Sequence, residues 1–134
     1  MNKHLYLRAY LAGIAVPTML MLVVLVVFVV ARFVYNVPIA IERLLVFPMA
    51  VVPNLWGVWN MLYVRLDSRR LPLGIHGATL VVFLAPIGLA LARALEIWIV
   101  TPSMVLAVAP VGLIVYYLLW KHIVGFLNQF LGVG

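Results

Sequence analysis

The polar side chains best placed to do chemistry lie inside an otherwise apolar stretch at 47–63. If 53–64 is helical, residues three, four and seven positions apart share one face, and that face carries a proline, an indole, a glycine and a carboxamide. Such a carboxamide can bond a neighbouring helix, or it can line a path for a neutral or anionic solute. The candidate residues for this packing face or solute path are Pro53, Asn54, Trp56, Gly57, Trp59 and Asn60.

Two prolines favour the second interpretation of this stretch. Proline has no backbone N–H, so Pro48 and Pro53 leave the carbonyls of Leu44 and Met49 without their usual helical donors. Loosened backbone beside amides can coordinate an ion or a polar substrate where it lines a cavity. Packing remains the first interpretation, because a glycine lets helix backbones approach and an amide cross-links helices in hydrocarbon.

The charged residues near the expected outer interface form a second candidate site. This outer charge cluster consists of Arg32, Glu42, Arg43, Arg93 and Glu96. Arg93 and Glu96 are three positions apart, a spacing that allows an ion pair across one helical turn. The cluster is either a set of ordinary interface charges or the mouth of an extracytoplasmic vestibule. No ionisable residue lies between the expected interfaces, and proton-coupled transporters generally need one there, so the sequence argues against proton coupling.

Three histidines, His4, His76 and His122, come from separate segments. Converging imidazoles can bind zinc or copper, but no H-x₃-H spacing supports a ligand set, and the sequence leaves their convergence open. The chain has no cysteine and no G-x-S-x-G or H-E-x-x-H motif. We therefore expect no enzyme activity, no catalytic residue, no metal and no cofactor.

Composition identifies the kind of element that must position these residues. The 134-residue chain is 68% hydrophobic and 9% charged, whereas a soluble domain is roughly 45–50% apolar and 25% charged. A spanning helix needs ~20 apolar residues, so the length allows about four spans. The sequence predicts an all-α integral membrane protein, a four-transmembrane-helix bundle that forms one domain over residues 1–134. The predicted spans are 10–34, 47–64, 77–93 and 103–120.

Local signals add detail to this bundle. Prolines inside the spans, at 17, 86 and 110, predict kinks, and Thr101 followed by Pro102 predicts the start of a helix. Residues 65–76 form the predicted cytoplasmic loop. Between 121 and 131 the apolar positions segregate with the period of a helix, which predicts a C-terminal amphipathic interfacial helix.

Basic residues predict the orientation. The side that holds both termini would carry six basic residues and the other side three, and this excess places both termini in the cytoplasm (N-in/C-in). The six are Lys3, Arg8, Arg65, Arg69, Arg70 and Lys121, and the three are Arg32, Arg43 and Arg93. Because the basic residues are spread over every polar gap, we expect no nucleic-acid partner. The expected location is the bacterial cytoplasmic (inner) membrane.

These observations lead to two functional hypotheses. The first is a non-enzymatic structural or accessory subunit assembled by helix packing. The alternative is a small oligomeric channel or carrier for a neutral or anionic solute, lined by the 53–60 face. A bundle of this size buries little protein surface, so the expected partners are the lipid bilayer and either further copies of the chain or a larger membrane complex. The sequence specifies neither the solute nor the oligomer number.

Overall fold

The computed structural model describes residues 3–66, 71–97 and 100–133, and this part of the chain is helical without a strand. The elements are α1 Leu5–Phe33, α2 Ile41–Leu44, η1 Leu45–Ala50, α3 Val51–Arg65, α4 Leu73–Ala94, α5 Pro102–Leu118, η2 Leu119–Val124 and α6 Gly125–Phe130. Four helical runs are long and apolar enough to cross a membrane: Leu5–Phe33, Ile41–Arg65, Leu73–Ala94 and Pro102–Phe130. The prediction of an all-helical chain with four apolar helices is confirmed.

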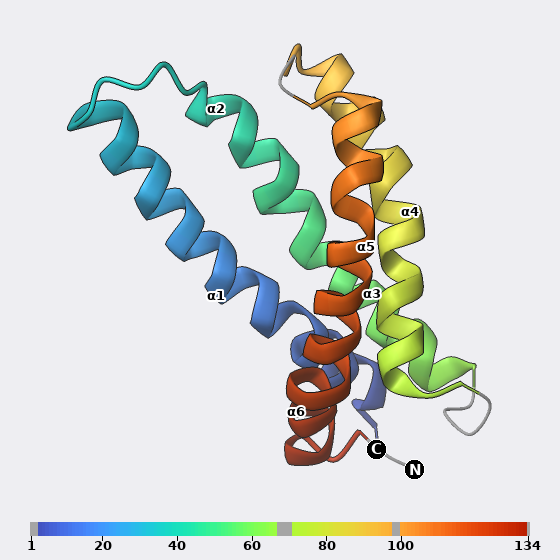
Figure 1. Cartoon of the computed structure of the whole chain (residues 1–134). Coiled ribbons are helices and arrows are strands. Elements are labelled where there is room, and N and C mark those ends of the chain that lie inside the picture. The colour runs from blue at the N-terminus through green and yellow to red at the C-terminus, as the bar shows by residue number, and fades with distance from the viewer. Residues whose placement is uncertain (1–2, 67–70, 98–99, 134) are drawn as a thin grey trace.

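The four runs alternate in direction (Figure 1). The connections α1–α2 and α4–α5 lie at one end of the bundle, and the beginning of α1 and the end of α6 lie together at the other end. Helices α4 and α5 run side by side, whereas α1 diverges from α2 towards their connection. The bundle is therefore tightest at the end that holds the termini.

Contact between α1 and α3 depends on small residues. Ala9, Ala12 and Gly13 are buried on α1, and a Cβ added to Gly13 would lie 2.5 Å from the carbonyl oxygen of Trp56 and 2.9 Å from Cα of Gly57. The two backbones are thus in direct contact at this crossing. Small residues four positions apart allow this approach between helices in apolar surroundings.

The second helical run is interrupted at Phe47. This residue has extended backbone angles (φ −139°, ψ 128°) and separates α2 from α3 within η1. Its ring lies against Gly88 of α4, where an added Cβ would be 2.8 Å from Cζ of Phe47. The interruption therefore positions the aromatic side chain of Phe47, from the second helical run, against α4. Pro17, Pro86 and Pro110 lie within helices, and the kinks expected there remain predictions.

The helix boundaries differ from the predicted spans in two places. Helix α1 begins at Leu5 and α4 at Leu73, so both extend further towards the end of the bundle that holds the termini. Pro72 directly precedes α4, which shortens the loop expected over 65–76. Its central residues 67–70, with Arg69 and Arg70, lie outside the described part of the chain. At the opposite end, Thr101 caps α5 through a bond from the Met104 backbone N–H (3.3 Å), as its position predicts.

The C-terminal segment also differs from its prediction. It is not a separate helix over 121–131, because α5 continues through the π-helical turn η2 into α6. Its buried residues are Trp120, Val124 and Asn128, whereas Phe126 and Phe130 are exposed. The periodicity assigned Asn128 to the polar, outward face, but its amide is bonded inside the bundle. Whether this segment lies in a membrane interface remains untested.

Candidate functional site

Asn60 lies at the centre of a buried polar cross-link. Its Nδ2 donates to the backbone carbonyl of Ala9 and to Oδ1 of Asn128, both at 2.7 Å. Nδ2 of Asn128 donates back to Oδ1 of Asn60 at 3.1 Å. Asn60 is fully buried and Asn128 is 5% exposed. The pair of amides joins α3 to both α1 and α6.

Asn54 also bonds to protein atoms, although it is exposed. Its Oδ1 accepts a hydrogen bond from the Tyr10 hydroxyl of α1, and its Nδ2 donates to the carbonyl of Ala50 one turn earlier (2.7 Å). Both amides of the predicted face are thus engaged within the bundle.

The two tryptophans of the predicted face connect α3 to the other half of the bundle. Trp56 is 2% exposed, and its Nε1 donates to the hydroxyl of Tyr116 on α5 at 3.2 Å. Its ring lies 4.9 Å from that of Tyr116 and 5.3 Å from that of Trp120. Edge-on and tilted aromatic pairs at these centroid distances are favourable, so this cluster anchors α3 to α5 and η2.

Trp59 and His76 form a reciprocal pair between α3 and α4. Nε1 of Trp59 donates to the carbonyl of His76 at 2.8 Å. The Trp59 carbonyl lies 2.9 Å from Nε2 of His76, and because a carbonyl only accepts, Nε2 carries the proton. The two rings stack with centroids 5.1 Å apart. His76 therefore serves as a connection between helices.

The predicted face as a whole packs against helices. Besides the amides and indoles, Pro53 is buried, and a Cβ on Gly57 would lie 2.5 Å from the Tyr10 ring. Sequence reasoning missed the partners Asn128 and Trp120. The i, i+4, i+8 spacing of Trp120, Val124 and Asn128 is the one signal that could have indicated a shared buried face.

The outer charge cluster separates into ion pairs. Arg32 pairs with Glu42 at 3.0 Å, and Arg43 pairs with Glu96 at 3.6 Å while also donating to the Glu96 carbonyl. Glu96 does not continue the helix of Arg93, because α4 ends at Ala94 and Glu96 has a positive φ of 56°. The pairs are solvent-exposed, and the vestibule hypothesis remains untested.

The three histidines lie apart, in different surroundings. His4 and His122 are exposed, whereas His76 is 4% exposed and packed among aromatic rings. Across residues 3–66, 71–97 and 100–133, no three His, Cys, Asp or Glu side chains are grouped as a metal site would need.

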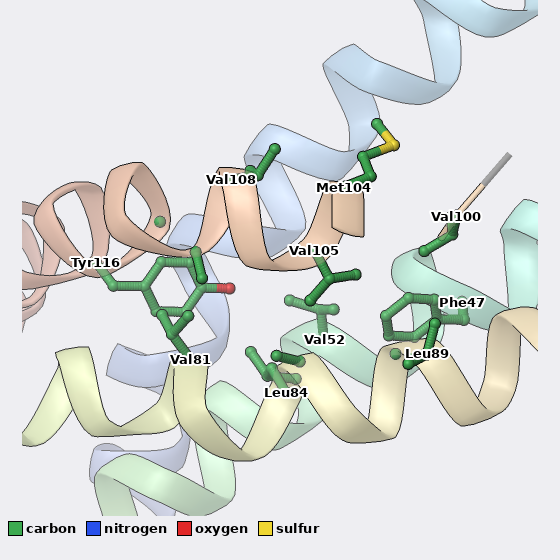
Figure 2. Close-up of a pocket in the computed structure, with 14 residues that line it drawn as sticks. Phe47, Val52, Val81, Leu84, Leu89, Val100, Met104, Val105, Val108 and Tyr116 are labelled. Atoms are coloured by element: carbon green, nitrogen blue, oxygen red, sulfur yellow. The ribbon is translucent and has the colours of Figure 1, made fainter. Parts of the chain in front are cut away.

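An apolar groove lies between α4 and α5, at a place that sequence reasoning did not identify. It has a volume of about 310 Å³. Figure 2 shows Val105 of α5 and Leu84 of α4 pointing towards one another, with Tyr116 at one end of the groove and Phe47 at the other. Its lining is Phe47, Val52, Val81, Leu84, Ala85, Gly88, Leu89, Val100, Met104, Val105, Val108, Ala109, Gly112 and Tyr116. Small residues of both helices line this space, Ala85 and Gly88 on α4 and Ala109 and Gly112 on α5.

Comparison with models of known protein families, with curated proteins and with solved structures finds no match to this chain. The interpretation of the site therefore depends on the geometry of its own residues.

Proposed function

We propose that this chain is a non-enzymatic integral membrane protein that acts as a structural or accessory subunit, assembled by helix packing in the bacterial cytoplasmic membrane. One observation carries the proposal. The Asn60 amide, the most deeply buried polar group of the predicted face, is bonded to α1 and α6. Interhelical amide bonds of this kind stabilise helix association in membranes by ~0.6–2 kcal/mol each.

The outer surface of the helices supports insertion into a bilayer. Only 6% of the most apolar window of α1 is buried inside the protein, and large apolar side chains such as Met19, Leu22 and Val23 are 59–70% exposed. An exposed apolar surface of this extent requires lipid or another protein to cover it. The same surface supports self-association or assembly into a larger membrane complex.

The channel or carrier hypothesis has no comparable observation in its favour. The 53–60 face contacts α1, α4, α5 and η2 through Tyr10, His76, Tyr116 and Trp120. A solute path along this face would require those helices to separate and the amide bonds to break. Helix packing, by contrast, is a function that this face can perform without any change in the arrangement of the helices.

An orientation with both termini in the cytoplasm forms part of the proposal. The beginning of α1 and the end of α6 lie at the same end of the bundle (Figure 1). Lys3, Arg8, Arg65 and Lys121 belong to segments at that end, and the positive-inside rule assigns such an end to the cytoplasm.

The test uses the absence of native cysteine. Single cysteines replace the exposed residues His4, Tyr35 and Gln129, and an impermeant maleimide is added to intact spheroplasts. We expect the protein to resist alkaline extraction, with labelling of Tyr35→Cys and protection of His4→Cys and Gln129→Cys until the membrane is opened. Extraction by alkali would overturn membrane insertion, and the inverse labelling pattern would overturn the orientation.

A flux assay separates the two functional hypotheses. Liposomes containing the wild-type protein should pass glycerol and chloride no faster than empty liposomes. Faster flux that Asn60→Leu alters while leaving assembly intact would overturn the structural role in favour of the solute path.

A further inference from the structure

The groove between α4 and α5 continues towards the outer end of the bundle. Val100 lines both this groove and a smaller cavity of about 170 Å³. On α4 the lining of the groove ends at Leu89, and the smaller cavity begins one turn later with Ala92 and Arg93. The apolar groove is therefore followed, towards the outer end of the bundle, by a smaller cavity that Arg93 and Glu96 line.

The dimensions of the groove fit one hydrocarbon chain. Its lining on α5 runs from Met104 to Tyr116, a distance of about 18 Å at 1.5 Å per residue. A volume of about 310 Å³ along that length describes a narrow groove. A helix with its side chains is ~10–12 Å wide and is too thick for this space. The length also matches about one leaflet of a hydrocarbon core ~30 Å thick.

The interior of the groove suits an alkyl chain chemically as well. Its lining consists of aliphatic side chains, glycines, one methionine and two aromatic rings. The hydroxyl of Tyr116 is the polar side-chain group of this lining, and it already accepts a hydrogen bond from Trp56. The rest of the lining offers no polar side-chain group to a solute.

The smaller cavity at the outer end of the bundle carries a cation whose charge is not neutralised. At this end Arg32 pairs with Glu42, and Arg43 pairs with Glu96. Glu96 lines the smaller cavity together with Arg93, but its carboxylate is the one already engaged by Arg43. Arg93 is exposed and has no ion-pair partner among the residues that the structure describes.

From this combination we infer that the groove binds one acyl chain of an anionic phospholipid, whose phosphate is bound by Arg93. Arginine binds phosphate through two parallel N–H groups, and the groove holds the chain below it. The inference rests on the proposed membrane insertion, since it requires lipid around the bundle. The inference adds an anionic phospholipid to the partners of the proposed accessory subunit.

Native mass spectrometry of the full chain in mild detergent tests this inference, with dioleoyl phosphatidylglycerol and dioleoyl phosphatidylcholine as probes. We expect one phosphatidylglycerol per protomer, retained about fivefold better than phosphatidylcholine, a preference of the size that one basic residue near anionic lipid produces. Arg93→Gln should remove the preference. Arg32→Gln changes the charge of the same end by the same amount and should keep it, because Arg32 lies on α1 and pairs with Glu42.

A second pair of variants tests the groove itself. Ala109→Phe fills it and should reduce retention of both lipids at least fivefold. Val111→Phe introduces the same ring two residues away, on a side chain that is 61% exposed and not part of the lining, and should retain lipid as the wild type does. Each variant is first checked for helicity by circular dichroism.

Two results would overturn the lipid assignment. One is equal retention of both lipids by wild type and Arg93→Gln. The other is a dimer that binds no lipid and that Ala109→Phe dissociates, which would identify a second copy of the chain as the occupant. Either result in a protein that still resists alkaline extraction leaves the proposed membrane role intact, whereas loss of membrane integration would overturn both.

Discussion

Asn60 and Asn128 donate hydrogen bonds to each other's side-chain oxygens, although they are 68 positions apart in the sequence. The exchange places two carboxamides in a site from which water is excluded. In such surroundings a partnered amide stabilises the fold, and an amide without its partner destabilises it. The two residues should therefore behave as one energetic unit.

A double-mutant cycle measures this coupling. Asn60→Leu and Asn128→Leu each keep the approximate volume but leave the other amide buried without its partner, so each should lower the free energy of unfolding by about 1–3 kcal/mol. Asn60→Leu should cost more, since it also removes the bond to the Ala9 carbonyl.

The double variant decides whether the coupling exists. It should be more stable than the sum of the single changes implies, by ~0.6–1.7 kcal/mol, the range of interhelical hydrogen bonds in membranes. Stability is followed by circular dichroism during denaturation with sodium dodecyl sulfate in mixed micelles. Strict additivity would show that the amides do not interact.

Gly77 provides a second test, because the fully buried Trp120 occupies the space beside it. A Cβ on Gly77 would overlap Cβ, Cγ and Cδ1 of Trp120. Gly77→Ala should therefore lower the free energy of unfolding by ~1–3 kcal/mol, the usual cost of overpacking, as measured in the same micellar denaturation.

Gly112→Ala is the matched control for this substitution. Its Cβ would meet only Cγ1 of Val81, at an ordinary contact distance of 3.6 Å. Stability should stay unchanged or rise by up to ~1 kcal/mol, as helix propensity implies. In the Trp120→Leu background, Gly77→Ala should cost less stability than it does in the wild type, because the ring that its Cβ would overlap is absent. Equal effects of the two alanines would contradict the close packing of Trp120 on α4.

The features that could be predicted from the sequence are those encoded by local pattern. Runs of ~20 apolar residues specified the four helices, and Thr101 with Pro102 marked the start of α5. Asn60 and Gly57 were recognised as packing residues because an amide and a glycine are conspicuous among Leu and Val. Their proximity in the structure to α1, at Ala9 and Gly13, agrees with that interpretation without testing the function.

The features that were missed depend on which helices become neighbours. The tail pattern assigned Asn128 to a polar outer face, since periodicity reports two faces without showing which one meets another helix. The Arg43–Glu96 pair depends on where α4 ends, and helix ends are not sharply encoded. The α4–α5 groove is lined in part by Gly88 and Gly112, but because most residues of both helices are apolar, periodicity does not distinguish the faces that line it.

The third prediction concerns the crossing of α1 and α3, where Gly13 and Gly57 are in contact. A Cβ on Gly13 would meet backbone atoms of Trp56 and Gly57, whereas a Cβ on Gly57 would meet the Tyr10 ring. Backbone cannot move aside without separating the helices, but a side chain can rotate. Gly13→Ala should therefore be the more destabilising substitution, by ~1–3 kcal/mol, with Gly57→Ala costing about 1 kcal/mol for the Tyr10–Asn54 hydrogen bond.

The Tyr10→Ala background separates these two causes. There the ring and its hydrogen bond are already absent, so Gly57→Ala should add almost no further loss of stability. Gly13→Ala should keep its full cost, because the opposing backbone is unchanged. Both variants are compared by micellar denaturation at the same protein-to-detergent ratio. If Gly13→Ala became neutral in this background, the α1–α3 crossing would be held by the Tyr10 side chain rather than by contact between the two backbones.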